Sequence, residues 1–322
     1  MIDKTDFVKK QMLFYFPSYG DKLSFKNDNI VIKDADNKIK FQVTCYRIFV
    51  VFIVGDTTIT TGLLSRAKKF GFSLCLMNRN MKIYQFISSR MEGNTFLRRR
   101  QYAYNGTELA RYITLNKVKN QRYVLASERN KNALTVDAIT LIDNYILSLE
   151  KDNLELTTIL GLEGVAAKVY FSRFFSSVGW QGRKPRIKSD YINATLDIGY
   201  TILFNIVDAL LNCYGFDEYC GVLHRCFYMR KSLVCDLMEP MRMIIDCAAR
   251  KAINLRQIKE SDFEIHNNSY VLNWKKSSEY TQIFIKAILE YREEIFMYIQ
   301  GFYRAFMKQK SFCEYPMFEY RR

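Results

Sequence analysis

The sequence predicts an α+β protein, with an antiparallel β-rich domain at residues 1–90 followed by a larger all-α domain at residues 91–322. Segments in the first ninety residues alternate polar with apolar side chains, which is the two-residue period of a strand with one buried face. After Thr95 the apolar residues recur at helical spacing, and only four prolines interrupt the chain. A chain of 322 residues is long enough for two domains with substantial cores.

The first domain is expected to be an antiparallel meander. Turn-forming residues, Asn27-Asp28 and Asp34 to Asn37, separate its alternating segments, and Ile48 to Val54 is a continuous apolar run that suits a buried strand. A short amphipathic helix is expected at Thr60–Lys69. The expected strands are Met12–Phe16, Lys22–Lys26, Asn29–Lys33, Lys38–Val43, Ile48–Val54, Phe72–Met77 and Lys82–Ile87.

The chain is strongly basic, with a formal net charge of +15, which favours a polyanionic partner: nucleic acid first and an anionic membrane second. The longest apolar run, Ile48–Val54, is far shorter than the roughly 20 residues that span a bilayer. The N-terminus lacks the apolar core of a secretory signal, and eight cysteines occur without Cys-x-x-Cys spacing. These features predict a cytoplasmic protein with reduced cysteines.

In the helical part, the run from Ile159 to Phe175 has apolar residues on several sides and predicts a central core helix. Glu163 is a lone carboxylate within it. A buried carboxylate without a partner is unfavourable, so Glu163 should be paired, protonated or bound to a metal. A capping or ion-pairing role is as compatible with the sequence as a ligand role.

The loop from Trp180 to Lys188 combines four cations with an aromatic side chain, and a long apolar helix follows from Asp190 towards Cys213. Cations interleaved with an aromatic can contact phosphates and stack on a base or sugar. A solvated linker would have a similar composition. The basic run Arg98 to Arg100 is typical of a solvated helix face.

The segment from His224 to Arg242 gathers a histidine and the carboxylates Asp236 and Glu239, whose spacing of three would place them on one face of a helix. Two such carboxylates resist ionising together unless a cation lies between them, and imidazole with carboxylates suits Zn, Mn or Mg. The alternative is an amphipathic helix with a charged outer surface. Pro240 predicts a kink or a helix start, and the second histidine, His266, lies in an expected loop.

Three segments together resemble the CRISPR-associated protein 1 family, the integrase of CRISPR adaptation. They are Glu163-Gly-x-Ala-Ala-x-x-Tyr170, Asp190-x-x-Asn-Ala-x-Leu-x-x-Gly-Tyr200, and His224 with Ser232-Leu-Val-x-Asp-Leu-Met-Glu-Pro-x-Arg242. The resemblance covers essentially the whole chain and is closest to versions from type V systems. Met229-Arg-Lys231 replaces the family's frequent Gly-Arg-Pro, and Met241 stands where an aromatic is common.

The resemblance implies Glu163, His224 and Glu239 as ligands of Mg or Mn, with Asp236 in an auxiliary catalytic role. Zinc is a weaker candidate because structural zinc sites usually have cysteine ligands. The implied reaction is attack by the 3′-hydroxyl of a spacer DNA on a phosphodiester of the CRISPR repeat. The basic residues near the motifs are expected to bind DNA phosphates: Arg173, Arg183, Lys184, Arg186, Lys188, Arg225, Arg230, Lys231 and Arg242.

The implied partners are double-stranded DNA, a second copy of the chain that dimerises through the β-rich domain, and a small bridging adaptation protein. One alternative is a metal-dependent endonuclease that uses the same residues on branched or single-stranded DNA without integration. The other is a nucleic-acid-binding protein without catalysis, in which the acidic residues only pair with cations.

Overall fold

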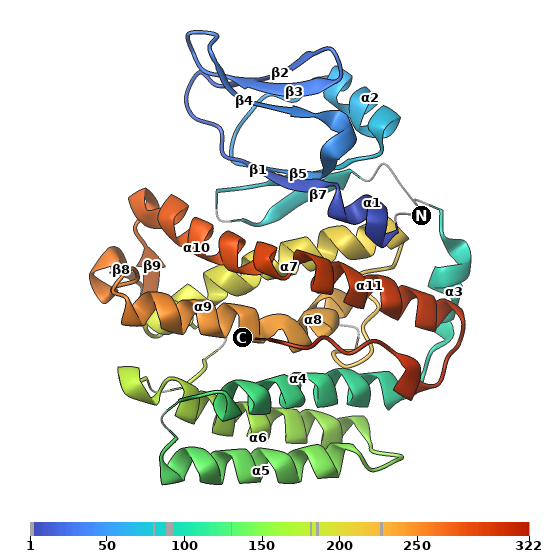
Figure 1. Ribbon diagram of the computed structural model, residues 1–322, viewed down its shortest axis with the longest axis vertical. Coiled ribbons are helices and arrows are strands. Elements are labelled where there is room, and N and C mark those ends of the chain that lie inside the picture. The colour runs from blue at the N-terminus through green and yellow to red at the C-terminus, as the bar shows by residue number, and fades with distance from the viewer. Residues whose placement is uncertain are drawn as a thin grey trace. The chain divides into compact units, whose positions relative to one another are not determined.

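The computed structural model describes residues 3–79, 81–87, 93–129, 131–180, 182–184, 187–225 and 228–321 (Figure 1). The chain forms two compact units, one of residues 1–102 with 208–217 and one of residues 103–207 with 218–322. The predicted order, a β-rich part before a helical part, is confirmed. The predicted boundary at residue 90 lies outside the described residues.

The first unit contains a four-stranded sheet in the order β1 (Gln11–Tyr15), β5 (Ile48–Val54), β6 (Ser73–Met77) and β7 (Ile83–Ile87). The prediction that all strands are antiparallel is wrong for this sheet, because β1 and β6 both run parallel to β5. Parallel neighbours need a long connection that returns the chain to the same end of the sheet, and here residues 16–47 connect β1 to β5 while α2 (Thr61–Phe70) lies between β5 and β6. Every residue of β5 is buried, as its apolar run predicts.

A second sheet consists of β2 (Lys22–Lys26), β3 (Asn29–Lys33) and β4 (Ile39–Thr44), all antiparallel as predicted. Its central strand is buried at Ile30, Val31 and Ile32, and side chains from both sheets and α2 share one apolar core. The short helix α1 (Lys4–Val8) was not predicted. Its N-cap is Asp3, whose carboxylate accepts a hydrogen bond from the Asp6 amide at 2.8 Å.

The larger unit is built from helices, and α4, α5 and α6 pack side by side in it (Figure 1). The helix α3 (Thr95–Ala103) precedes them, and α7 contributes residues 191–207 to this unit. The remaining bounds are α4 (Glu108–Ala126), α5 (Ala133–Leu149), α6 (Leu156–Phe174), α7 (Tyr191–Tyr214), α8 (Ser232–Met238), α9 (Arg242–Asn254), α10 (Ser277–Glu290) and α11 (Arg292–Met307).

The long helix α7 is apolar enough, by length and composition, to cross a membrane. However, 78% of its most apolar window is buried inside the protein. This burial is typical of a core helix.

The larger unit is not entirely helical, which corrects the all-α prediction. The strands β8 (Phe263–His266) and β9 (Ser269–Leu272) form an antiparallel hairpin, so His266 lies on a strand and not in a loop. Its two connecting residues, Asn267 and Asn268, have φ values of 48° and 59°. Asparagine tolerates this left-handed conformation, and a two-residue turn with both φ values positive matches the twist of a hairpin.

The segment from Tyr315 to Tyr320 is held along α4 by side-chain amides. Asn116 donates to the Phe318 carbonyl at 2.8 Å and accepts from the Phe318 amide at 2.9 Å. Asn120 donates to the same carbonyl at 2.8 Å, donates to the Pro240 carbonyl at 2.9 Å, and accepts from the Tyr320 amide at 3.1 Å. These bonds replace water around buried polar groups and fix one side of α4.

Candidate active site

The centre of the candidate site is Lys117 on α4, a residue that the sequence analysis did not single out. Its side chain is only 6% exposed, and its ammonium lies against two carboxylates. It contacts Glu163 Oε1 from α6 and lies 2.6 Å from Glu239 Oε2. We call Lys117, Glu163 and Glu239 the carboxylate clasp. A signal for it was present in the sequence, since a lysine within the apolar pattern of α4 requires a charged partner when buried.

Glu163 therefore has the ion-pair partner that its setting predicted. The helix that carries it is not buried on all sides, which corrects the expectation of a core helix: Gly161, Gly164 and Lys168 of α6 are exposed. Its buried face consists of Ile159, Ala166, Tyr170, Phe171 and Phe174. The Glu163 side chain is 22% exposed, so the carboxylate clasp lies next to an accessible helix face.

Glu239 is almost completely buried, with a side chain 4% exposed, and lies between two cations. Arg242 Nη2 is 2.8 Å from Glu239 Oε1, on the side of the carboxylate that Lys117 does not contact. Burial would raise the pKa of Glu239. The positive charges of Arg242 and Lys117, with a smaller contribution from His224, lower this pKa to about 2 instead. Glu239 is therefore ionised at neutral pH.

Burial would lower the pKa of the Lys117 ammonium, because it disfavours the charged form. The charges of Glu239 and Glu163 outweigh burial and raise this pKa above its usual value. The carboxylate clasp with Arg242 thus contains two negative and two positive charges.

Pro240 ends the helix that carries Asp236 and starts the turn that carries Glu239. The helix α8 ends at Met238, residues Glu239–Met241 form a 3-10 turn, and α9 begins at Arg242. Proline is tolerated in the first turn of a helix, where its missing N–H would have no intrahelical partner. The two carboxylates consequently belong to different surroundings, although they are three residues apart.

Asp236 is fully buried and organises the 221–225 loop. Its Oδ2 accepts hydrogen bonds from the amides of Val222 at 2.7 Å and Leu223 at 2.9 Å, and its Oδ1 accepts from the His224 amide at 3.0 Å. The His224 ring contacts the same Oδ1 through Nδ1, at 2.7 Å. A carboxylate accepts hydrogen bonds, so Nδ1 is the donor in this contact, and in the neutral ring Nε2 carries the lone pair.

Gly221 allows this close approach. A Cβ at residue 221 would lie 2.6 Å from Ser232 Cβ and 2.8 Å from Asp236 Oδ2, closer than such atoms can pack. The loop can therefore close on Asp236 only with glycine at residue 221.

The donor set suits a divalent cation. Two carboxylates already hold one cation, the Lys117 ammonium, and the neutral ring of His224 would offer a nitrogen lone pair at Nε2. Among the described residues, however, no three His, Cys, Asp or Glu side chains are gathered closely enough to hold a metal ion as they stand. The Lys117 ammonium lies between the two carboxylates.

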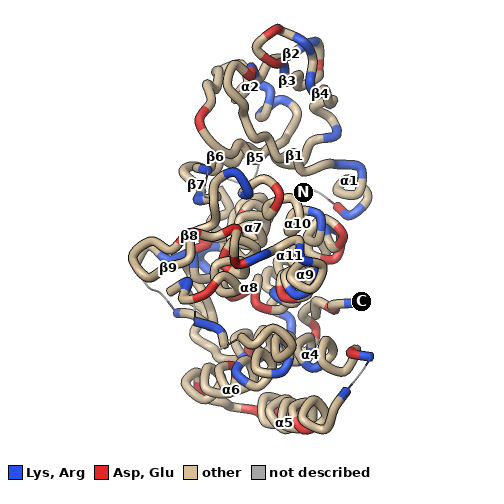
Figure 2. Tube along the Cα trace, turned by 90° about the vertical axis from the view of Figure 1, so that its left-hand side faces the viewer, with Lys and Arg blue, Asp and Glu red and all other residues tan. Residues whose placement is uncertain are grey.

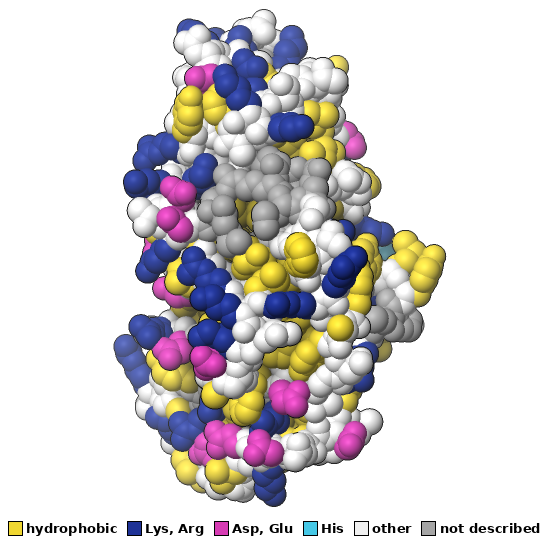
Figure 3. All heavy atoms as spheres, turned by 90° about the vertical axis from the view of Figure 1, so that its right-hand side faces the viewer, with side chains coloured by type: hydrophobic (Ala, Val, Ile, Leu, Met, Phe, Trp, Pro, Cys, Tyr) yellow, Lys and Arg dark blue, Asp and Glu magenta, His cyan; other side chains and the backbone are white. Residues whose placement is uncertain are grey.

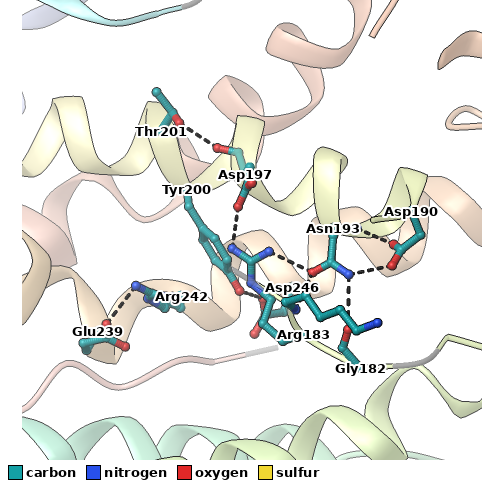
Figure 4. Close-up of polar contacts among 11 residues, drawn as sticks. Gly182, Arg183, Asp190, Asn193, Asp197, Tyr200, Thr201, Glu239, Arg242 and Asp246 are labelled. Carbon is teal, nitrogen blue, oxygen red and sulfur yellow. Dashed lines mark hydrogen bonds and ion pairs between the residues drawn. The ribbon is translucent and has the colours of Figure 1, made fainter. Parts of the chain in front are cut away.

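Arg183, a predicted DNA ligand, is built into a polar network (Figure 4). Its guanidinium donates to Asn193 Oδ1 at 3.0 Å and to Asp197, and lies 5.3 Å from the centre of the Tyr200 ring. Arg242 lies 4.7 Å from the centre of the same ring, whose hydroxyl donates to Asp246. The basic loop is thus linked through Tyr200 to the arginine that contacts Glu239.

The other predicted DNA ligands differ in exposure. Lys184 and Arg225 are exposed, and Arg225 donates weakly to the Asn105 and Gly106 carbonyls at 3.3 and 3.4 Å. Lys231 pairs with Glu218 at 3.3 Å. Arg173, Lys188 and Arg230 are partly buried, and Arg186 lies outside the described residues. Basic residues occur along both units (Figure 2), and on one face Lys and Arg side chains cluster around exposed apolar ones (Figure 3).

Residues 14–286 match the family model described as "CRISPR associated protein Cas1". The chain belongs to this family. The chain is 29% identical to "CRISPR-associated endonuclease Cas1 2" of Rhodospirillum rubrum over 277 residues, which cover 80% of each protein. It is 36% identical to "CRISPR-associated endonuclease Cas1" of Leptospira interrogans over 172 residues, or 48% of this chain and 66% of that one.

Solved Cas1 structures share its fold. A Cas1 protein from Thermotoga maritima has a TM-score of 0.75 at 19% identity, with 97% of this chain and 100% of that one covered. A Cas6-RT-Cas1–Cas2 complex gives 0.76 at 19% identity, covering 98% of this chain but 36% of the longer one. A casposase bound to integration product gives 0.68 at 19% identity, covering 98% and 96%. These similarities confirm the predicted Cas1 fold.

Proposed function

We propose that this Cas1 protein is a divalent-metal-dependent DNA integrase of CRISPR adaptation. It joins the 3′-hydroxyl of a spacer DNA to a phosphodiester at the edge of a CRISPR repeat by transesterification. Family membership supports the biological role, and the casposase bound to its integration product supports the joining reaction on a similar fold. The net charge of +15 supports DNA as the substrate.

The carboxylate clasp beside His224 carries this proposal. Glu163, Glu239 and Nε2 of His224 hold Mg or Mn, which are better suited than zinc to a set of two oxygens and one nitrogen. When bound, the metal supplies polarisation of the scissile phosphate and stabilises charge on the attacking and leaving oxygens.

The chain's other residues position this site. Asp236 fixes the ring orientation and tautomer of His224, so its role is auxiliary. Arg242 balances the charge of Glu239, and exposed cations such as Lys184 bind the DNA backbone. The attacking group comes from DNA, so no nucleophilic side chain is required.

The proposed assembly contains two copies of the chain and a small bridging protein. Integration at both ends of a repeat requires two sites, which favours a homodimer. The outer strand β4 of the first unit exposes Ile39 and Phe41, and such an edge can pair with a second copy. The Cas1–Cas2 complexes with a similar fold support Cas2 as the bridging protein. The eight cysteines lack Cys-x-x-Cys spacing, which supports a cytoplasmic location with reduced thiols.

A second candidate function is favoured by the names of the relatives, several of which are called endonucleases. With water in place of the DNA hydroxyl, the same residues would hydrolyse a phosphodiester. Joined products then separate the two functions, since only an integrase requires a free 3′-hydroxyl.

The deciding experiment mixes the purified protein and Mn or Mg with an end-labelled duplex and a plasmid that carries a CRISPR repeat, with and without Cas2. We expect label on the plasmid for the wild type, and none for His224→Ala or for a 3′-blocked duplex. Cleavage without joining would favour the endonuclease. Binding without either reaction would contradict both functions.

A further inference from the structure

The charges of the carboxylate clasp and Arg242 cancel without a bound metal. Lys117 and Arg242 contribute two positive charges, and Glu163 and Glu239 contribute two negative charges. All four side chains are at least three-quarters buried, and Lys117 is 6% exposed. Charges in such surroundings are weakly screened, so an added charge is felt strongly.

A divalent cation at the same place would leave a surplus of two positive charges. The Lys117 ammonium also occupies the space between the two carboxylates, in contact with Glu163 and 2.6 Å from Glu239. The ammonium must therefore move when Glu163 and Glu239 turn to a metal, and it needs another anion within reach.

The DNA substrate supplies that anion. Each phosphodiester carries one negative charge, and the partly exposed Glu163 side chain leaves one side of the site open to a scissile phosphate. Lysine is suited to this exchange because its ammonium is a point charge on a flexible four-carbon stem with donors that rotate.

We propose that Lys117 couples metal binding to DNA binding: its ammonium holds the carboxylates until a DNA phosphate draws it away and a divalent cation replaces it. This inference rests on the proposed function, since it concerns the same metal site. In the absence of DNA, Lys117 competes with the metal. With DNA present, Lys117 contacts the phosphate that the metal also binds.

Coupling of this kind is reciprocal, so DNA should increase metal affinity by the same factor as the metal increases DNA affinity. The factor expected is within the range of about 5- to 150-fold that is usual for linked sites. In a variant without the ammonium, the metal should bind well even without DNA.

The test measures Mn²⁺ affinity of the full chain by calorimetry and electron paramagnetic resonance, without DNA and with a 3′-dideoxy duplex that cannot react. We expect wild type to bind Mn²⁺ more tightly with DNA. Lys117→Met should bind Mn²⁺ more tightly than wild type without DNA and lose most of the DNA dependence. Lys119→Met is the matched control, because Lys119 lies on the same helix and pairs at the surface with Glu150 at 3.0 Å.

Equal Mn²⁺ affinity of wild type with and without DNA would overturn the coupling, as would an unchanged DNA dependence in Lys117→Met. If Lys117→Met does not fold, the wild-type comparison and Lys117→Arg, which should retain the DNA dependence, decide the question. Failure of the proposed function looks different: Mn²⁺ would then not bind under any condition, or binding would be the same in His224→Ala.

Discussion

Asp236 and Glu239 are carboxylates three residues apart, but they are held in opposite ways. Asp236 is surrounded by hydrogen-bond donors from the 221–225 loop, namely three backbone amides and the ring of His224. Glu239 is surrounded by charged side chains, Lys117 and Arg242. Backbone amides cannot leave, whereas a lysine side chain can. The comparison shows how one short segment provides both a fixed support and an exchangeable ion-pair partner.

The largest effect should follow from removing the fixed support. Asp236→Ala would leave three buried amides of the 221–225 loop without acceptors, each at a cost of about 1–3 kcal/mol. We expect the free energy of unfolding to fall by at least about 3 kcal/mol in urea titrations. Asp137→Ala, which removes an exposed carboxylate on α5, should change it by less than about 0.5 kcal/mol. Equal stability of the two variants would contradict the role of Asp236.

Glu239→Gln should separate catalysis from folding. The amide keeps the shape of the side chain but removes the charge that Lys117 and Arg242 neutralise. Loss of a residue that supports a metal ligand commonly costs 10–100-fold, so loss of a ligand itself should reduce joining by more than about 100-fold. Single-turnover joining assays measure this effect, with circular dichroism as the check of folding. Retained joining would show that Glu239 is a structural residue only.

A third buried carboxyl group, that of Asp246, predicts a pH dependence of stability. Burial raises the pKa of Asp246 from 3.8 to about 6, although Tyr200, Arg242, Arg183 and Tyr170 partly oppose the increase. A carboxyl whose pKa is raised on folding binds its proton more tightly in the folded state, so its contribution to stability decreases as pH rises from about 4 to about 6.

We therefore expect wild type to lose roughly 2 kcal/mol relative to Asp246→Asn between pH 4 and pH 7. Urea unfolding at several pH values measures the difference between the two proteins, which cancels the titration of groups common to both. A difference that does not change with pH would show that Asp246 titrates normally.

The smallest effect concerns two neighbouring cations, Lys184 and Arg183. Lys184 is exposed, so Lys184→Ala should leave stability unchanged and reduce the salt dependence of DNA affinity by about one phosphate contact. Arg183 bonds to Asn193 and Asp197, so Arg183→Ala should lower stability by about 1–3 kcal/mol. Binding isotherms at several salt concentrations and urea titrations test both. The reverse pattern would place Lys184 in the fold and Arg183 on the DNA.

Local patterns in the sequence predicted most elements. The strand Ile48–Val54 and the break at Pro240 have the predicted bounds, because each depends on residues next to each other in the chain. The direction of the neighbouring strands did not follow from the apolar pattern. β5 is buried throughout, and either a parallel or an antiparallel neighbour is compatible with that burial. The polar run around His266 resembled a loop, whereas Asn267 and Asn268 form the turn of a hairpin.

The candidate site was only half visible in the sequence. The motifs marked Glu163, His224 and Glu239, but Lys117 lies 46 residues before Glu163, outside every motif. Its ion pair with Glu163 depends on how α4 and α6 pack, which no local sequence pattern specifies. Similarly, composition marked Arg183 as a phosphate ligand, whereas its contacts with Asn193 and Asp197 arise only when the loop folds onto α7.

The hydrogen bonds between α4 and residues 315–320 can form only late in synthesis, because they join distant parts of the sequence. The hydrogen bonds between Asn116 and Phe318 cannot form until Phe318, 202 residues later in the sequence, has been synthesised. At a synthesis rate of about 5–20 residues per second, that interval lasts roughly 10–40 s. The buried amides of Asn116 and Asn120, on the helix that carries Lys117, therefore gain these partners only after nearly the whole chain has been synthesised.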